Sequence, residues 1–159
     1  MICTFFGRQD TPCEVKALLK SAVVDMIVTE GVNTFLVGNN GQFDYYAQCV
    51  LQELKDAGAD IDYSIVLSRP NEKALSNHQN ATVFPEEMEN IIPRFAISKR
   101  NDWMIRQSSF VIAYAPNQYS NSGRWCAKAR KRGLKVIDLG QKLRSIIEKC
   151  KKVQKSIIE

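Results

Sequence analysis

The stretch from residue 35 to residue 44 constrains the fold more than any other part of the sequence. An apolar run at residues 35–37 is followed by Gly38 and Gly41, and a helical pattern of apolar residues begins at Phe43. This order predicts a strand, a tight loop and the start of a helix. Glycine has no Cβ and adopts positive φ at low cost, so backbone N–H groups of such a loop can converge on an anion. The Gly-x-x-Gly spacing matches neither the dinucleotide-binding fingerprint nor a Walker A loop, so an ordinary tight turn is an equal alternative.

Strand-sized apolar runs and helical spacing alternate along most of the chain. The apolar runs lie at residues 2–6, 34–37, 63–67, 111–115 and 135–139, with helical patterns between them and after the last. Two helix starts carry capping signals, namely Thr11 with Pro12 and Glu14 for the first helix, and Ser122 for the helix after the fourth strand. Alternation at these lengths predicts right-handed βαβ crossovers, and therefore an α/β fold with a parallel sheet.

Composition excludes several classes of protein. The chain has 159 residues, 45% of them apolar and 25% charged, which fits a single globular domain over residues 1–159. The first residues show no signal-peptide pattern and the apolar runs are strand-sized, so we expect a cytoplasmic protein without a membrane partner. The five cysteines are scattered and form no Cys-x-x-Cys pair, so we expect no zinc site. Nothing in the sequence requires another metal or a cofactor.

Two segments depart from the regular alternation. Residues 68–90 are polar and contain the only histidine, His78, and a polar segment of that length predicts a loop or lid beside the third strand. The C-terminal helix, residues 139–159, has an apolar side that is longer than one sheet face needs, so we expect a homo-oligomer. The apolar side consists of Leu143, Ile146, Ile147, Cys150 and Val153.

Three separated motifs give the chain a resemblance to a known family. Residues 4–7 read Thr-Phe-Phe-Gly, residues 38–44 read Gly-Asn-Asn-Gly-Gln-Phe-Asp, and residues 94–104 read Arg-Phe-Ala-Ile-Ser-Lys-Arg-Asn-Asp-Trp-Met. With these motifs the chain resembles the YpsA-like branch of the SLOG superfamily from about residue 2 to residue 139. The resemblance implies a Rossmann-like three-layer sandwich with a five-stranded parallel sheet in the order 3-2-1-4-5. It also implies that a nucleotide or nucleotide-derived ligand binds at the C-terminal edge of that sheet.

Two departures from the family pattern bear on catalysis. Relatives in this branch typically read Phe-Gly-His-Arg after the first strand, whereas Gly7 is followed here by Arg8 and Gln9. The related LOG phosphoribohydrolases carry Pro-Gly-Gly-x-Gly-Thr-x-x-Glu after their fourth strand, whereas residues 119–125 contain one glycine and no glutamate. Glycosidic cleavage needs a carboxylate that stabilises an oxocarbenium-like centre or activates water. We therefore expect ligand binding without turnover.

The motifs assign roles to individual side chains. Backbone N–H groups at residues 38–41 and 122–123 would bind phosphate, with charge from arginine and lysine side chains, while Asp44 would accept a hydrogen bond from a ribose hydroxyl. Phe6, Tyr119 or Trp125 could stack on a base. The resemblance predicts that residues 99–101 contact the ligand, although composition alone predicts an exposed helix face there. The expected ligand-binding residues are Gly7, Arg8, Gly38, Asn39, Asn40, Gly41, Phe43, Asp44, Lys99, Arg100, Asn101, Tyr119, Ser122 and Gly123.

Three hypotheses about function follow. SLOG domains also sense nucleotide second messengers in anti-phage signalling, so the first is a sensor or sequestering sponge for an ADP-ribose-type or cyclic nucleotide, encoded by a bacterium or a phage. The second is a nucleotide N-glycosidase of the LOG type, with Asp44 the best candidate for a catalytic carboxylate. The third is nucleic-acid binding, suggested by kinship to the DNA-processing protein DprA, a net charge of +5 and a lysine-rich tail. We rank the third last, because the basic residues are not interleaved with aromatic ones.

Overall fold

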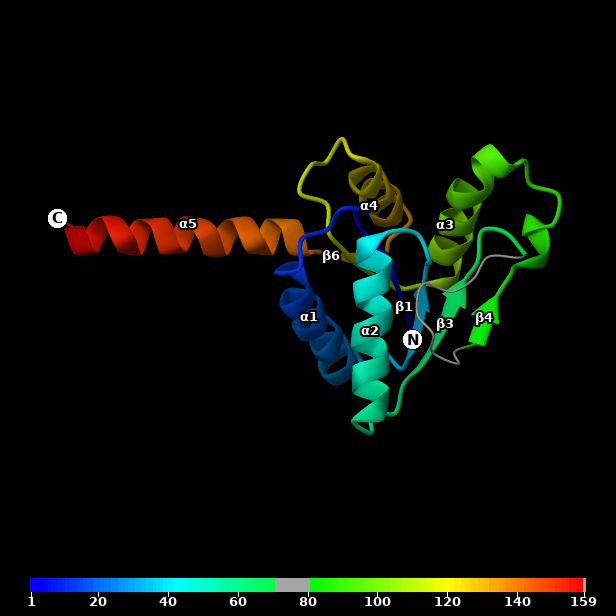
Figure 1. The fold of residues 1–159 in the computed structure, drawn as a ribbon, viewed down its shortest axis with the longest axis horizontal. Coiled ribbons are helices and arrows are strands. Elements are labelled where there is room, and N and C mark those ends of the chain that lie inside the picture. The colour runs from blue at the N-terminus through cyan, green and yellow to red at the C-terminus, as the bar shows by residue number, and fades with distance from the viewer. Residues whose placement is uncertain (71–80, 159) are drawn as a thin grey trace.

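The computed structural model describes residues 1–70 and 81–158, and it shows a Rossmann-like α/β fold built in three layers (Figure 1). The described residues form a six-stranded sheet in the order β4-β3-β2-β1-β5-β6, and every pair of neighbouring strands is parallel. The strands are β1 (Ile2–Phe6), β2 (Thr34–Val37), β3 (Asp62–Val66), β4 (Ala81–Val83), β5 (Phe110–Ala113) and β6 (Lys135–Asp138). The helices are α1 (Val15–Glu30), α2 (Gln42–Asp56), α3 (Ala96–Gln107), α4 (Asn121–Lys131) and α5 (Leu139–Ile158), with 3₁₀ turns η1 (Glu86–Met88) and η2 (Pro93–Phe95).

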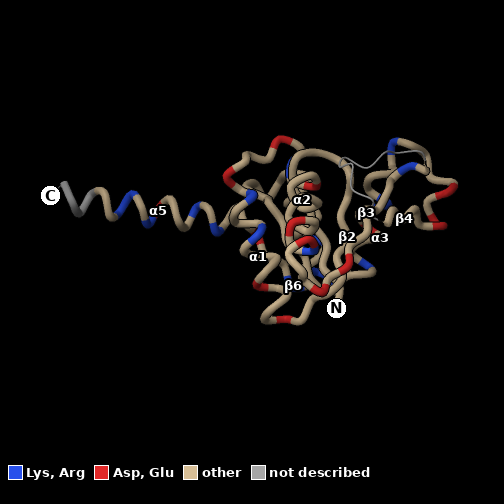
Figure 2. Tube along the Cα trace, turned by 60° about the horizontal axis from the view of Figure 1, so that its bottom comes forward, with Lys and Arg blue, Asp and Glu red and all other residues tan. Residues whose placement is uncertain are grey.

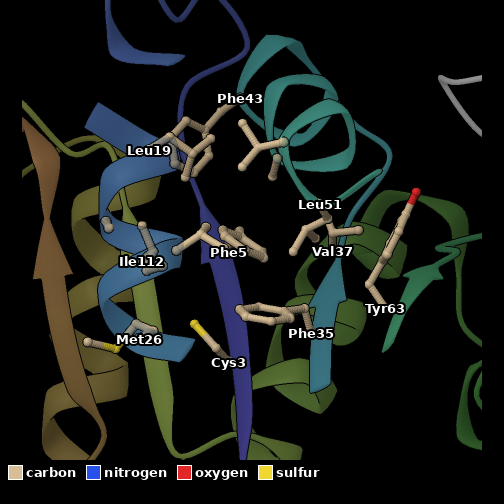
Figure 3. Close-up of a cluster of buried hydrophobic side chains, with 14 of the residues drawn as sticks. Cys3, Phe5, Leu19, Met26, Phe35, Val37, Phe43, Leu51, Tyr63 and Ile112 are labelled. Carbon is tan, nitrogen blue, oxygen red and sulfur yellow. The ribbon is translucent and has the colours of Figure 1, made fainter. Parts of the chain in front are cut away.

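Alternating side chains of the strands supply two hydrophobic cores, one on each face of the sheet. On one face Phe5 and Phe35 stack with ring centroids 6.0 Å apart, and Leu19 of α1 and Leu51 of α2 cover them (Figure 3). On the other face Phe6 packs in a second cluster with residues of α3 and α4. Strands buried on both faces read as continuous apolar runs, which is why β1, β2, β3 and β5 could be predicted from the sequence. The fifth predicted strand, β6, lies at the sheet edge and is exposed or half-buried.

The sixth strand corrects the prediction of a five-stranded sheet. The predicted strands do follow the order 3-2-1-4-5, but β4 pairs with β3 and becomes the sheet edge, inside the segment expected to be a loop or lid. The N–H group of Leu67 donates to the carbonyl of Val83 (2.8 Å), and Met88 in η1 is buried. Residues 81–90 are therefore packed against the body of the protein, while His78 lies outside the described residues.

Both predicted helix starts are displaced. α1 begins at Val15, and within the described residues no side chain caps its first N–H groups. Thr11 instead donates its hydroxyl hydrogen to the carbonyl of Arg8 (2.7 Å), which fixes the turn after β1. In α4 the N-cap is Ser120 rather than Ser122, because the Ser120 hydroxyl accepts from the N–H group of Gly123 (3.2 Å).

Helix α5 leaves the body of the protein (Figure 1). Its first residue, Leu139, is fully buried, whereas Ile146 is 46% exposed and Val153 is 58% exposed. Lys and Arg residues are spaced along the same helix (Figure 2). In the part of the chain that the structure describes, no helix is both long and apolar enough to cross a membrane.

Candidate functional site

A cavity of about 470 Å³ lies at the carboxyl end of β1. The order of the strands reverses between β1 and β5, and open α/β sheets place their ligands outside the strand ends at such a switch point. The walls are formed by the end of β1 and the loop after it, the loop after β2 and the first turn of α2, helix α3, and the start of α4. The lining residues are Phe5, Phe6, Gly7, Arg8, Gln9, Asp10, Asn40, Asp44, Ile97, Arg100, Asn101, Ser120, Asn121, Ser122 and Trp125.

The loop after β2 is held against the loop after β1. Gly41 has a φ of 101°, and a Cβ there would lie 2.6 Å from the Cα of Gln9. The N–H groups of Gln42 and Phe43 donate to the carbonyls of Gln9 (2.9 Å) and Arg8 (3.4 Å). The first N–H groups of α2 are thus engaged within the protein, so this loop positions the cavity wall and does not offer these groups to an anion.

Two buried charged side chains form the floor of the cavity. Asp44 is 7% exposed and Arg100 is 3% exposed, with 4.0 Å between Asp44 Oδ2 and Arg100 Nη2. Burial raises the pKa of the Asp44 carboxyl, while the charge of Arg100 and the N–H group of Asn40, which donates to Asp44 Oδ2 (2.9 Å), oppose that rise. A Cβ at Gly38 would lie 2.4 Å from Asp44 Oδ2, so the glycine makes room for this pair.

Hydrogen bonds from both sides fix the guanidinium of Arg100. Its Nε and Nη2 donate to the side-chain oxygen of Asn101 (3.2 and 2.9 Å), and its Nη1 donates to that of Asn39 (3.1 Å). The side chain is therefore preorganised at the floor of the cavity.

The start of α4 forms the opposite wall. Ser120, Asn121 and Ser122 line the cavity. The N–H group of Gly123 is capped by the Ser120 hydroxyl, so the N–H groups of Asn121 and Ser122 are those that this helix start can offer to a ligand. The helix dipole favours an anion at this end. Below this wall Trp125 stacks on Phe6, with ring centroids 5.9 Å apart.

Arg8 stands at the mouth of the cavity. Its Nε and Nη2 donate to the two carboxylate oxygens of Asp10 (2.8 and 2.9 Å), and both side chains are substantially exposed. An exposed ion pair contributes little to stability, so the guanidinium can exchange Asp10 for an anionic ligand at small cost.

The structure brings half of the predicted site residues together. Those that line the cavity are Gly7, Arg8, Asn40, Asp44, Arg100, Asn101 and Ser122. Gly38, Asn39, Gly41 and Phe43 lie behind the wall, where they shape the loop or support the floor. Lys99 is exposed on α3, and Tyr119 and Gly123 line a different hollow.

Sequence reasoning missed six lining residues, which are Phe5, Gln9, Asp10, Ile97, Ser120 and Asn121. Each of them lies in a segment that the motifs had already selected or directly beside one. These residues line the cavity because their segments contact other segments of the chain. No local sequence pattern predicts such contacts. Among the described residues no group of three or more His, Cys, Asp or Glu side chains could hold a metal ion.

These features define a class: a Rossmann-like α/β domain with a polar cavity, lined by two arginines and two aspartates, at the switch point of its sheet. No protein-family model matches the chain, and a search of curated proteins finds none that matches it. The class therefore rests on the fold and the cavity.

Proposed function

We propose that the protein binds a phosphate-bearing nucleotide or nucleotide-derived ligand in the cavity at the end of β1. The observation that carries the proposal is the convergence of the α4 N-terminus, Arg8 and the buried Arg100 on one cavity at the switch point of the sheet. Phosphate is the ligand group that suits a helix N-terminus together with guanidinium groups.

The cavity offers matching surfaces for the rest of a nucleotide. Asp44, Asn40 and Asn101 can exchange hydrogen bonds with sugar hydroxyls, while Ile97 and Trp125 supply apolar surface for a base. The volume of about 470 Å³ falls in the range of small-molecule pockets. Because α2 uses its first N–H groups internally, the phosphate faces α4 and the sugar faces Asp44.

Binding without turnover is the form of the proposal that the resemblance to SLOG proteins supports. The protein would then be a sensor or a sponge for an ADP-ribose-type or cyclic nucleotide signal. Asp44 is held by the N–H group of Asn40 and lies near Arg100, which suits a carboxylate that fixes a loop and accepts a hydrogen bond.

One observation favours an enzyme as the second candidate. Asp44 lines the cavity and has a raised pKa, the combination expected of a general acid or base. In that case the protein would release free base from a nucleotide, as an N-glycosidase does.

The test combines ligand identification with two matched variants. Small molecules released by denaturing the purified protein are identified by mass spectrometry, and nucleotides, ADP-ribose derivatives and cyclic nucleotides are screened by thermal shift. Arg8→Ala should weaken binding of the best ligand by about 10- to 100-fold, because a charged hydrogen bond to phosphate is lost. Lys99→Ala removes an equal charge outside the cavity and should leave the affinity unchanged.

The outcomes separate the candidates. An intact ligand after incubation supports a binder, whereas free base that no longer forms in Asp44→Asn supports the N-glycosidase. A screen in which none of these compounds raises the melting temperature, with no nucleotide released on denaturation, would refute the proposed pocket.

A further inference from the structure

A second hollow, of about 420 Å³, lies on the other side of α4 from the first cavity. It opens at the carboxyl ends of β5 and β6, between α4 and the first turns of α5. Its lining residues are Ala115, Pro116, Asn117, Gln118, Tyr119, Gly123, Cys126, Arg130, Asp138, Gln141 and Arg144. None of these residues lines the first cavity, so the two hollows have separate walls.

Two arginines from different helices give the second hollow its positive charge. Arg130 comes from α4 and Arg144 comes from α5, and both side chains are exposed to solvent. The one carboxylate in the lining, Asp138, is engaged in structure: its Oδ1 accepts from the N–H groups of Ala115 (3.1 Å) and Gly140 (2.9 Å). The hollow therefore presents guanidinium groups to a ligand, while the carboxylate holds the start of α5.

Cysteine chemistry does not explain the hollow. Cys126 lies in its wall, but burial, with the charge of Asp138, raises the pKa of the thiol to about 11. A thiol with that pKa stays protonated at neutral pH and is a poor nucleophile.

A short ridge at residues 119–120 separates the two hollows. Ser120 faces the first cavity and Tyr119 faces the second. The ridge is tightly built, because a Cβ at Gly123 would lie 2.4 Å from the carbonyl oxygen of Gln118. Tyr119 is 77% exposed, so its ring is accessible at the rim of the second hollow. A ligand that crosses the ridge would contact this ring.

We propose that the second hollow is a subsite for a second phosphate, so that the ligand class is a dinucleotide whose two phosphates are separated by a nucleoside. This inference rests on the proposed function of the first cavity. One phosphate lies at the N-terminus of α4, the chain of the ligand passes over the ridge beside Tyr119, and the other phosphate pairs with Arg130 and Arg144. A mononucleotide fills the first cavity alone.

The experiment compares two probes on three proteins by isothermal titration calorimetry at about 0.15 M salt. The probes are AMP and the linear dinucleotide 5′-pApA. The proteins are the wild type, the double variant R130A/R144A, and the control K131A/K142A, which removes two charges from the same helices outside the hollow. Thermal unfolding without ligand checks that each variant is folded.

We expect the wild type to bind pApA about 10- to 100-fold more tightly than AMP. In R130A/R144A the affinity for pApA should fall to that for AMP, with AMP binding unchanged, while the control should behave as the wild type. Equal affinity of the wild type for the two probes would overturn the subsite and leave the first cavity intact. An equal loss of both probes in R130A/R144A would also overturn it. Binding of neither probe to the wild type would overturn the dinucleotide subsite, whereas the proposed function falls only if the wider ligand screen also finds nothing.

Discussion

Replacing Arg100 with methionine should destabilise the protein strongly, and the size of the effect should depend on whether residue 44 carries a charge. The two side chains are almost fully buried, with 4.0 Å between Arg100 Nη2 and Asp44 Oδ2. At that separation, an effective dielectric constant of about 20 gives an attraction of about 4 kcal/mol. Removing one partner of a buried ion pair costs about 3–5 kcal/mol, so we expect a loss in that range for Arg100→Met.

A double-mutant cycle isolates the interaction. Urea unfolding at pH 7, followed by circular dichroism, gives the unfolding free energy of the wild type, Arg100→Met, Asp44→Asn and the double variant. Because Asp44→Asn removes the charge that Arg100 neutralises, the double variant should lose about 1–3 kcal/mol less than the sum of the single losses. The exposed pair Lys16 and Glu53 is the control, and its cycle should give a coupling below about 1 kcal/mol.

The pH dependence gives an independent check on the same carboxyl. The pKa of Asp44 is raised in the folded protein, so between its unfolded and folded values the native state binds more protons than the unfolded state. The unfolding free energy of the wild type should therefore fall relative to that of Asp44→Asn as the pH rises from about 4 through the raised pKa. Additive losses within about 0.5 kcal/mol, or a difference that does not change with pH, would refute the electrostatic account of the cavity floor.

Three further predictions concern the elements around the site. Ser120→Ala should lower the melting temperature by about 2–4 °C through loss of the N-cap, and an equal effect of Ser122→Ala in calorimetry would contradict the observed cap. Gly41→Ala should lose more than about 1 kcal/mol in urea unfolding because of its positive φ and its contact with Gln9, and a neutral result would contradict that loop geometry. The uncovered apolar side of α5 should pair with α5 of a second copy. Oxidation should then cross-link the two copies through Cys150, and Cys150→Ser should abolish the cross-link. Light scattering should show more dimer as salt screens the basic helices from one another, and a monomer at every salt concentration would rule the pairing out.

Most of the fold could be predicted because four of its strands, β1, β2, β3 and β5, are largely buried. β1, β2, β3, β5 and β6 read as apolar runs between amphipathic helices, and that alternation determines a parallel α/β sheet. β4 could not be predicted in the same way. It has three residues, its side chains are partly or fully exposed, and it is a strand only because the edge of β3 accepts it. The pairing is a tertiary effect without a local signal.

Helix starts were predicted to within a few residues but not to the residue. Residues 120–122 read Ser-Asn-Ser, so three successive side chains are able to cap a helix. Ser120 is selected because Gly123 packs closely against the carbonyl oxygens of Asn117 and Gln118, which places its N–H group near the Ser120 hydroxyl. That choice depends on the path of the preceding loop and not on intrinsic capping preference.

Dependence on contacts between distant segments also explains the largest difference between the predicted site and the cavity in the structure. The motifs selected loops that line the cavity, and the glycine spacing at Gly38 and Gly41 predicted an anion site before α2. In the folded chain the carbonyls of Arg8 and Gln9 accept the N–H groups of Phe43 and Gln42 at the start of α2, and the Asp44 carboxylate accepts that of Asn40. The partners are 33 residues apart for Gln9 and Gln42 and 35 for Arg8 and Phe43. No local pattern predicts their contact, because it forms only when β1 and β2 pair.

The hydrogen bonds at the start of α2 also decide which way round we propose that a nucleotide lies in the cavity. Because carbonyl groups engage the first N–H groups of α2, the positive end of α4 and the guanidinium of Arg8 attract the phosphate in the proposed binding mode, while the carboxyl of Asp44 lines the same cavity from the first turn of α2. A nucleotide placed the other way would bring its phosphate beside a buried carboxylate, where like charges repel. The buried Arg100 moderates this repulsion, so in the binding mode that we propose the floor contacts the uncharged sugar and the start of α4 contacts the phosphate. Asp44→Asn, which removes this charge, should therefore weaken the preference for the proposed orientation over the reversed one, and it should not weaken the attraction of the cavity for phosphate.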